Sequence, residues 1–360
     1  MKIIYKLLFL FLLTIGYSSC DFLDIVPDEI TTEADAFKDR NAAKNFVYSC
    51  YGYLPQSNVA SGSLDLLTGD EVITAFEHET FASFPKGNYT ASSPVISYWN
   101  TFFQGLRQCY IFLENVDKVP DLTESVKTDY IAQVKFLIAY YHYQLARCYG
   151  PIILIKELPD VNASQAEYLP RTSYDECVDW ICNLLDEAAS SLPAIRTNKE
   201  DYGLATSVGA KAVKAKMLLY AASPLFNGNS SFYSNFTDKS GSQLMPLTYD
   251  PNKWVKAKTA IKEAIDLAEQ NGHALYVKQD YKIGNEDANP YPAAGPVRCL
   301  RTSLVDWDSR NPEVLLAETR SEGSYGIQNK SLPFVTDGWA WNGVGPTWTM
   351  LNRFYTKNGL

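Results

Sequence analysis

The fold of this chain is decided by residues 130–154, which read YIAQVKFLIAYYHYQLARCYGPIIL. Apolar and aromatic side chains recur there at spacings of three and four residues, which lays one stripe along a helix of about six turns. Ile138 and His142 widen the apolar surface to a second side. The stretch therefore predicts a central helix with neighbours on two sides. Gly150 and Pro151 end it, because glycine adopts the left-handed conformation readily and proline cannot continue a helix.

Other amphipathic segments flank the central helix and predict a mostly α-helical chain. They begin near residues 40, 95, 174, 207 and 252, and short polar links between some of them predict antiparallel helical hairpins. The starts do not keep the 34-residue period of tetratricopeptide repeats. We therefore expect a degenerate tetratricopeptide-like scaffold with long irregular loops and little β structure. A single β-like run is predicted at Val314 to Ala317.

Two helix starts carry recognisable signals. Ser173 with Glu176 three residues later predicts a capping box at the start of one helix. Asp250 followed by Pro251 predicts the start of another helix, with the aspartate as its N-cap. The stripe on that second helix predicts that its large apolar side chains, including Trp254 and Ile265, face inward.

The first 19 residues predict an export signal. Lys2 and Lys6 form a positive region, a short apolar run follows, and small residues lead to Cys20. This cysteine after two serines resembles the lipobox of bacterial lipoproteins, which predicts lipidation of Cys20 and a tether over residues 20–32. The alternative is a plain signal peptide with an incidental cysteine. Once residues 1–19 are removed, 30 basic residues stand against 41 acidic ones, so we expect an acidic, extracytoplasmic protein.

Several functional classes are disfavoured by composition and motifs. A net charge of −9 without a cluster of Lys and Arg argues against nucleic-acid binding. There is no CxxC pair, and none of the three histidines are spaced i, i+4, so we expect no metal site and no cofactor. Export permits disulfides, but most cysteines lie on helical stripes, and the sequence assigns no disulfide pair. No catalytic motif is visible, and we expect no enzyme activity. The acidic pairs Asp70 with Glu71 and Glu77 with Glu79 could be imagined as a glycosidase acid and base, but such pairs arise by chance among 41 acids.

A series of short motifs runs through nearly the whole chain. They are Cys20 with Phe22-Leu23-Asp24, YWNTFFQGLRQCYIFLEN at 98–115, Phe136-Leu137 with Ala139-Tyr140-Tyr141, Asn311 to Leu315, and Pro346-Thr347. In this order they resemble the SusD/RagB outer-membrane lipoproteins of Bacteroidetes. The resemblance implies an N-terminal SusD-like helical domain over residues 33–228 and the start of the C-terminal domain over residues 229–360. Members of this family are usually longer, so the C-terminal domain is expected to be truncated here.

The resemblance also implies a function. It implies a surface-exposed lipoprotein of the outer membrane that binds an oligosaccharide or other nutrient and has no catalytic activity. Its implied partner is a SusC-like TonB-dependent transporter, with which it would act in oligosaccharide uptake. The alternative is a helical-repeat interaction lipoprotein that binds only protein partners and uses its aromatic residues as interface anchors.

Aromatic residues on loops are the candidate sugar contacts, because a sugar presents apolar C–H faces ringed by hydroxyls. The clearest segment is DGWAWNG at residues 337–343. Tyr89 lies in a second segment, the long excursion at 57–93, which is rich in Ser, Gly and acidic residues. Loops of that length are usually functional or disordered. The candidate ligand-binding residues are Asp337, Trp339, Trp341, Asn342, Trp307 and Tyr89. The alternative is that the tryptophans of the 337–343 segment pack against the scaffold. Trp99 and Trp254 lie on helical stripes and are predicted to belong to the core.

Overall fold

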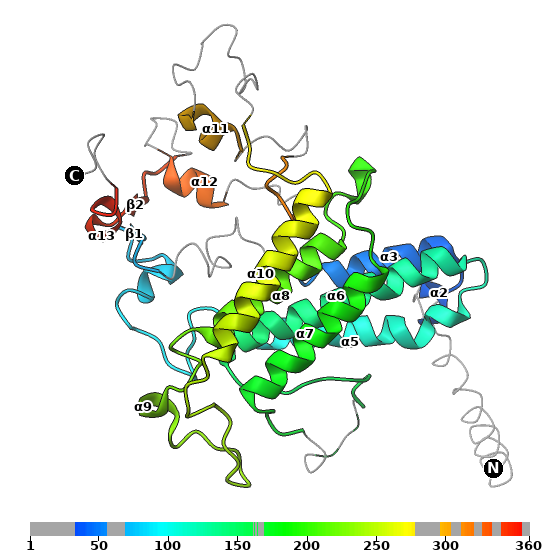
Figure 1. Cartoon of the computed structure of the whole chain (residues 1–360), viewed down its shortest axis with the longest axis horizontal. Helices are drawn as coiled ribbons and strands as arrows, with labels where there is room; N and C mark the ends of the chain where they lie inside the picture. Colours follow the sequence, from blue (N-terminus) through cyan, green and yellow to red (C-terminus); the bar gives the residue numbers. More distant parts are fainter. Residues whose placement is uncertain are drawn as a thin grey trace, which may run out of the picture.

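The computed structural model describes residues 33–55, 69–160, 162, 164, 169–277, 296–303, 311–319, 326–332 and 340–354. Helices dominate these residues, as the sequence predicts (Figure 1). The longer helices are α3 (Arg40–Tyr51), α5 (Trp99–Asn115), α6 (Glu124–Tyr149), α7 (Tyr174–Ser191), α8 (Ser207–Ala222), α10 (Asn252–Gln270) and α11 (Pro296–Ser303). The short elements are α2 (Glu33–Ala36), β1 (Val72–Thr74), η2 (Thr80–Ser83), η3 (Val116–Lys118), η5 (Lys199–Asp201), α9 (Ser230–Tyr233), α12 (Gly326–Ser331), β2 (Val344–Pro346) and α13 (Trp348–Leu351).

The central helix of the scaffold is α6. It packs against α5 and α7 and also contacts α3 and α8. Leu137 and Ile138, on different sides of α6, are both buried, so the predicted burial on two sides is confirmed. The helix ends at Gly150, whose φ of 71° lies in the region that favours glycine.

Aromatic residues fix the packing of α3 and α5 on α6. The Tyr141 hydroxyl donates a hydrogen bond to the carbonyl oxygen of Cys50 in α3, and the Tyr141 ring stacks on Phe102 with ring centroids 5.7 Å apart. Gly105 makes this close approach possible, because a Cβ atom there would lie 3.0 Å from both the Tyr141 ring and Cβ of Tyr53. These contacts bury large aromatic surfaces at the centre of the core.

A buried histidine joins α6 to the segment that follows it. The Nδ1 atom of His142 donates to the carbonyl oxygen of Ile138 at 2.8 Å, and Nε2 accepts from the backbone N–H of Ile155 at 3.1 Å. Nε2 can accept this bond only when the imidazole is neutral. Burial also disfavours the charged form and lowers the pKa of His142 to about 4.

The contact between α8 and α10 corrects one prediction. The residues of α10 that are buried are alanines: Ala257, Ala260, Ala264 and Ala268. Trp254 and Ile265 are exposed, so the prediction that they face inward was wrong. Small side chains let the two helices approach closely, so Trp254 and Ile265 lie toward the outer side of α10. Ile261 packs partly buried against the alanines, as predicted. Trp99, in contrast, packs against the main core.

Three local predictions also have clear outcomes. Ser173 occupies the N-cap of α7 but its side chain makes no capping hydrogen bond, so the predicted capping box is absent. Asp250 accepts a hydrogen bond from the N–H of Asn252 at 2.9 Å, although Pro251 holds the N-cap position of α10. Residues 314–317 form no strand, because their segment bends and packs beside α8 and the end of α10.

Membrane-spanning helices and clustered metal ligands are both missing from the described part of the chain. No helix among the described residues is long and apolar enough to cross a membrane. Within the same residues, no group of three or more His, Cys, Asp or Glu side chains is placed to hold a metal ion.

Candidate functional site

A two-stranded antiparallel sheet brings together two parts of the chain that are far apart in sequence. β1 pairs with β2 in the register Val72 with Pro346, Ile73 with Gly345, and Thr74 with Val344. Figure 1 shows β1, β2, α12 and α13 side by side, at one side of the helical scaffold. We call residues 69–93, 326–332 and 340–354 the β1–β2 unit.

The excursion contributes a small apolar cluster to the β1–β2 unit. Phe81, in η2, is buried among Val72, Phe84 and Val344, which come from both strands and from the turn after η2. The Phe84 ring then meets the ring of Tyr89 edge-on, with centroids 5.5 Å apart. Tyr89 is 50% exposed, so one side of its ring packs while the rest faces solvent. Part of the long excursion is therefore ordered by its contact with the C-terminal segment.

The loop before β2 holds Trp341 by its backbone. The N–H of Trp341 donates to the carbonyl oxygen of Asn329 at 3.0 Å, and the N–H of Asn342 donates to that of Leu332 at 2.7 Å. Asn342 has a φ of 50°, a left-handed conformation that asparagine tolerates better than most residues. Gly343 follows and packs so tightly that a Cβ atom there would lie 2.4 Å from the Phe76 ring.

A charged pair lies against the side chain of Trp341. The Lys330 ammonium lies over the Trp341 ring, 5.3 Å from its centroid, and also forms an ion pair with the Glu79 carboxylate. Glu79 belongs to the excursion and Lys330 to α12, 251 positions apart. The sequence carries no sign of this pairing, because nothing in its pattern links residues so distant. Trp341 itself is 42% exposed.

The structure places three of the predicted ligand-binding residues in the β1–β2 unit. Tyr89, Trp341 and Asn342 offer two partly exposed aromatic rings, a hydroxyl and an amide, which are the groups that a sugar-binding surface needs. The other predicted site residues lie outside the described residues: Asp337, Trp339, Trp307 and the lipidation candidate Cys20. What the structure adds to the predicted set is Lys330 and Glu79.

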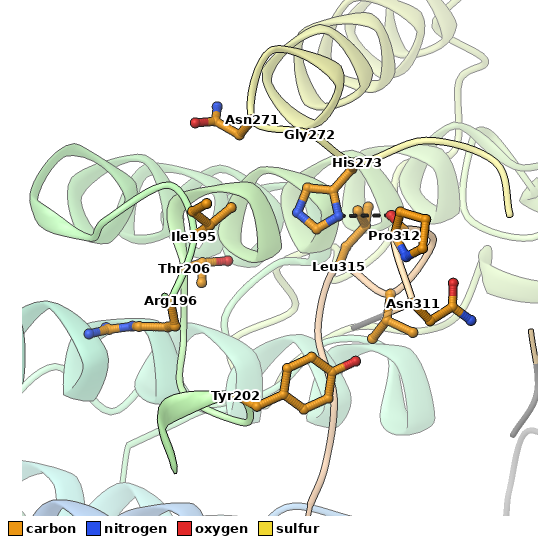
Figure 2. A pocket seen from close by; sticks show the side chains of 11 residues that line it. Ile195, Arg196, Tyr202, Thr206, Asn271, Gly272, His273, Asn311, Pro312 and Leu315 are labelled. Atoms are coloured by element: carbon orange, nitrogen blue, oxygen red, sulfur yellow. Dashed lines mark hydrogen bonds between the residues drawn. The ribbon is translucent and has the colours of Figure 1, made fainter. Parts of the chain in front are cut away.

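A separate pocket of about 170 Å³ lies where the α7–α8 connection, the end of α10 and residues 311–315 meet. Figure 2 shows the His273 imidazole at its wall, hydrogen-bonded through Nδ1 to the carbonyl oxygen of Pro312 at 2.9 Å. The side chain of Arg196 is directed away and binds Asp129. The Asn311 amide oxygen accepts from the N–H of Glu313 at 3.0 Å. Much of this polar lining therefore holds the 311–315 segment in place, and the β1–β2 unit is the stronger candidate for ligand binding.

Together, the helical fold and the β1–β2 unit define a class of protein: a helical-hairpin scaffold that carries a small appended unit with exposed aromatic rings. The profile of a SusD-like family, described as "Starch-binding associating with outer membrane", matches residues 21–219, which is more than half of the chain. The chain belongs to this family. The resemblance inferred from the sequence motifs and the predicted fold class are both confirmed.

Individual relatives agree with the family assignment. A SusD-like protein of Formosa agariphila is 23% identical over 230 residues, which cover 60% of this chain and 43% of the relative. The solved structure of BT4246 is 31% identical to this chain and superimposes with a TM-score of 0.73. The match covers 88% of this chain and 57% of the BT4246 chain. A SusD-like protein of Bacteroides fragilis shares the fold at 20% identity, with a TM-score of 0.67 and coverage of 92% and 56%. The chain therefore spans about half the length of these relatives.

Family membership gives the general character of the protein. Proteins of this family bind carbohydrate, are not catalytic, and associate with the outer membrane. The prediction that the chain is not an enzyme is confirmed at this level.

Proposed function

We propose that this protein is a cell-surface glycan-binding lipoprotein that acts with a TonB-dependent outer-membrane transporter in the uptake of oligosaccharides. Family membership supports carbohydrate binding and an outer-membrane setting. The transporter, the lipid anchor at Cys20 and the identity of the glycan are parts of the proposal. So is the division at residue 228 into a helical domain and the start of a second domain. In the structure α10, which lies beyond that position, packs against α8.

One observation carries the proposal for this chain: Trp341, Asn342 and Tyr89 belong to one β1–β2 unit, although Tyr89 lies some 250 positions from the other two. The partly exposed indole ring can stack on the apolar face of a pyranose ring. The Asn342 amide and the Tyr89 hydroxyl can exchange hydrogen bonds with sugar hydroxyls. A pair of aromatic rings held by packing loses little conformational entropy when a ligand binds.

The test is affinity electrophoresis of the chain in gels that contain soluble starch or one of a panel of other polysaccharides. We expect Trp341→Ala to lower the affinity for the retained polysaccharide about tenfold, the upper range for one aromatic contact. Trp254→Ala is the matched control, because Trp254 is 41% exposed, almost the same as Trp341, but lies on α10. Equal effects of the two substitutions would contradict the proposed site. Retention by no polysaccharide, together with capture of a protein partner, would favour the alternative of a protein-binding lipoprotein.

A further inference from the structure

Lys330 lies between two side chains that come from distant parts of the chain. Its Nζ atom is 5.3 Å from the centroid of the Trp341 ring, and the same ammonium is paired with the Glu79 carboxylate. Both charged side chains are largely withdrawn from water, Lys330 being 20% and Glu79 12% exposed. Nε2 of His78 lies 3.6 Å from the same carboxylate, at the solvent side of the pair.

A second ion pair in the excursion is far more exposed. Lys86 and Glu77 are paired at 3.3 Å, but their side chains are 54% and 87% exposed. Exposed pairs of long side chains contribute little, because water screens them and the side chains remain free to rotate. A desolvated cation over an indole ring is attracted more strongly than an exposed one. The Lys330 ammonium can therefore restrain the Trp341 ring, whereas the Lys86 ammonium has no comparable neighbour among the described contacts.

The backbone hydrogen bonds of the loop do not by themselves fix the orientation of the Trp341 ring. The hydrogen bonds of the Trp341, Asn342 and Gly343 N–H groups fix the main chain of the loop. They do not fix the two side-chain torsions of the indole, which decide whether its ring is presented flat to a ligand. A ring held in one orientation before binding costs less entropy on binding than a ring that must be immobilised by the ligand.

We propose that Lys330 and Glu79 are positioning residues for Trp341: Lys330 fixes the orientation of the indole ring, and Glu79 fixes Lys330. The position of Glu79 in the excursion thereby determines the orientation of the Trp341 ring, which lies far away in the sequence. The value of this arrangement for ligand affinity rests on the proposed function. The positioning itself is a property of the chain without ligand.

The first test reads the indole directly and needs no ligand. The full chain is labelled with 5-fluorotryptophan, and the ¹⁹F resonance of Trp341 is assigned as the one that Trp341→Phe removes. We expect Lys330→Met, which keeps the aliphatic stem and removes the charge, to shift and broaden this resonance. Glu79→Gln should do the same to a smaller extent, and Lys330→Arg should restore a sharp signal. The matched controls Lys86→Met and Glu77→Gln should leave it unchanged.

The second test measures affinity for the polysaccharide that the unmodified chain retains in the gel. Lys330→Met should weaken binding by less than the roughly tenfold loss expected when the Trp341 ring is removed, and the combination of Lys330→Met with Glu79→Gln should cost no more than the larger single effect. A Trp341 resonance that is the same in Lys330→Met as in the parent chain would overturn the positioning role. If Trp341→Ala leaves binding intact while Lys330→Met still shifts the resonance, the positioning role stands and the proposed ligand site fails. Far-UV circular dichroism of each variant checks that the helical scaffold is unchanged.

Discussion

Arg196 donates two parallel hydrogen bonds to the Asp129 carboxylate, from Nη1 to Oδ2 at 2.9 Å and from Nη2 to Oδ1 at 2.8 Å. The same guanidinium donates from Nε and Nη2 to the carbonyl oxygen of Ala205. One side chain in the α7–α8 connection therefore ties together α6 and the start of α8. Gln133 adds a hydrogen bond to Asp129 from the next turn of α6.

Replacing Arg196 should destabilise the whole scaffold. We expect Arg196→Met to lower the free energy of unfolding by about 2 to 4 kcal/mol, because it leaves Asp129 and the Ala205 carbonyl short of partners. Arg196→Lys should recover less than half of this loss, since an ammonium cannot form the two parallel bonds. Urea denaturation followed by circular dichroism measures both. Lys135→Met, which breaks the more exposed pair with Glu187, should change the free energy by less than about 1 kcal/mol. A similar loss for Lys135→Met would show that the geometry at Arg196 has no special role.

His142 predicts a pH dependence of stability. Its pKa is about 4 in the folded chain and about 6.5 when unfolded, so between these values the unfolded state binds more protons. The stabilisation from neutral His142 is therefore complete above pH 6.5 and is lost as the pH falls toward 4. Between pH 7 and pH 4 the free energy of unfolding should fall in both chains. The fall should be about 3 kcal/mol larger in the parent chain than in His142→Gln. Urea denaturation at several pH values compares the two slopes, and parallel curves would contradict the role of His142.

Two glycines in the β1–β2 unit offer a matched pair. Gly343→Ala would push a methyl group into the Phe76 ring, whereas a methyl group on Gly345 would meet no heavy atom within 4 Å. We expect Gly343→Ala to destabilise the β1–β2 unit by about 1 to 3 kcal/mol and Gly345→Ala to change it by less than about 0.5 kcal/mol. Amide exchange of Val72 to Thr74 should speed up in the first variant alone, while α6 amides keep their protection. Unchanged exchange in both variants would contradict the tight contact at Phe76.

The lipid anchor can be tested independently of the structure. If Cys20 is the acylated residue, Cys20→Ala should move the protein from the membrane fraction to the soluble fraction without altering its circular dichroism. Metabolic labelling with a fatty-acid analogue reports the modification directly. Equal labelling of Cys20→Ala and the parent chain would show that Cys20 carries no lipid.

The helical scaffold could be predicted from sequence because its signals are local. The spacing of apolar residues on α6 and the turn at Gly150 both lie within one stretch of chain, and both predictions agree with the structure. The prediction of which face of α10 is buried was wrong, and the reason is not local. Its stripe of large residues looked like a buried face, but the alanines decide how close α8 can come.

The candidate site could be predicted only in part. Trp341, Asn342 and Tyr89 could be proposed as ligand contacts because aromatic residues in polar loops are visible in the sequence. Their assembly was not predicted, since it depends on two three-residue strands that are too short to show periodicity. The pairing of Lys330 with Glu79 carries no signal in the sequence, because it depends on the sheet that brings the two segments together.

The alanine seam between α8 and α10 has a consequence for how the scaffold opens. Ala215, Ala260 and Ala264 form a cluster of their own, apart from the main core around α6. Since the free energy of burial scales with apolar area, a seam of methyl groups secures α10 less firmly than aromatic packing secures α5. We therefore expect α10 to detach as an early cooperative unit while the helices around α6 persist. The surface uncovered by such an opening would carry alanine methyl groups with Leu218 and Ile261 beside them, a small apolar patch that gives the partly open chain little tendency to aggregate.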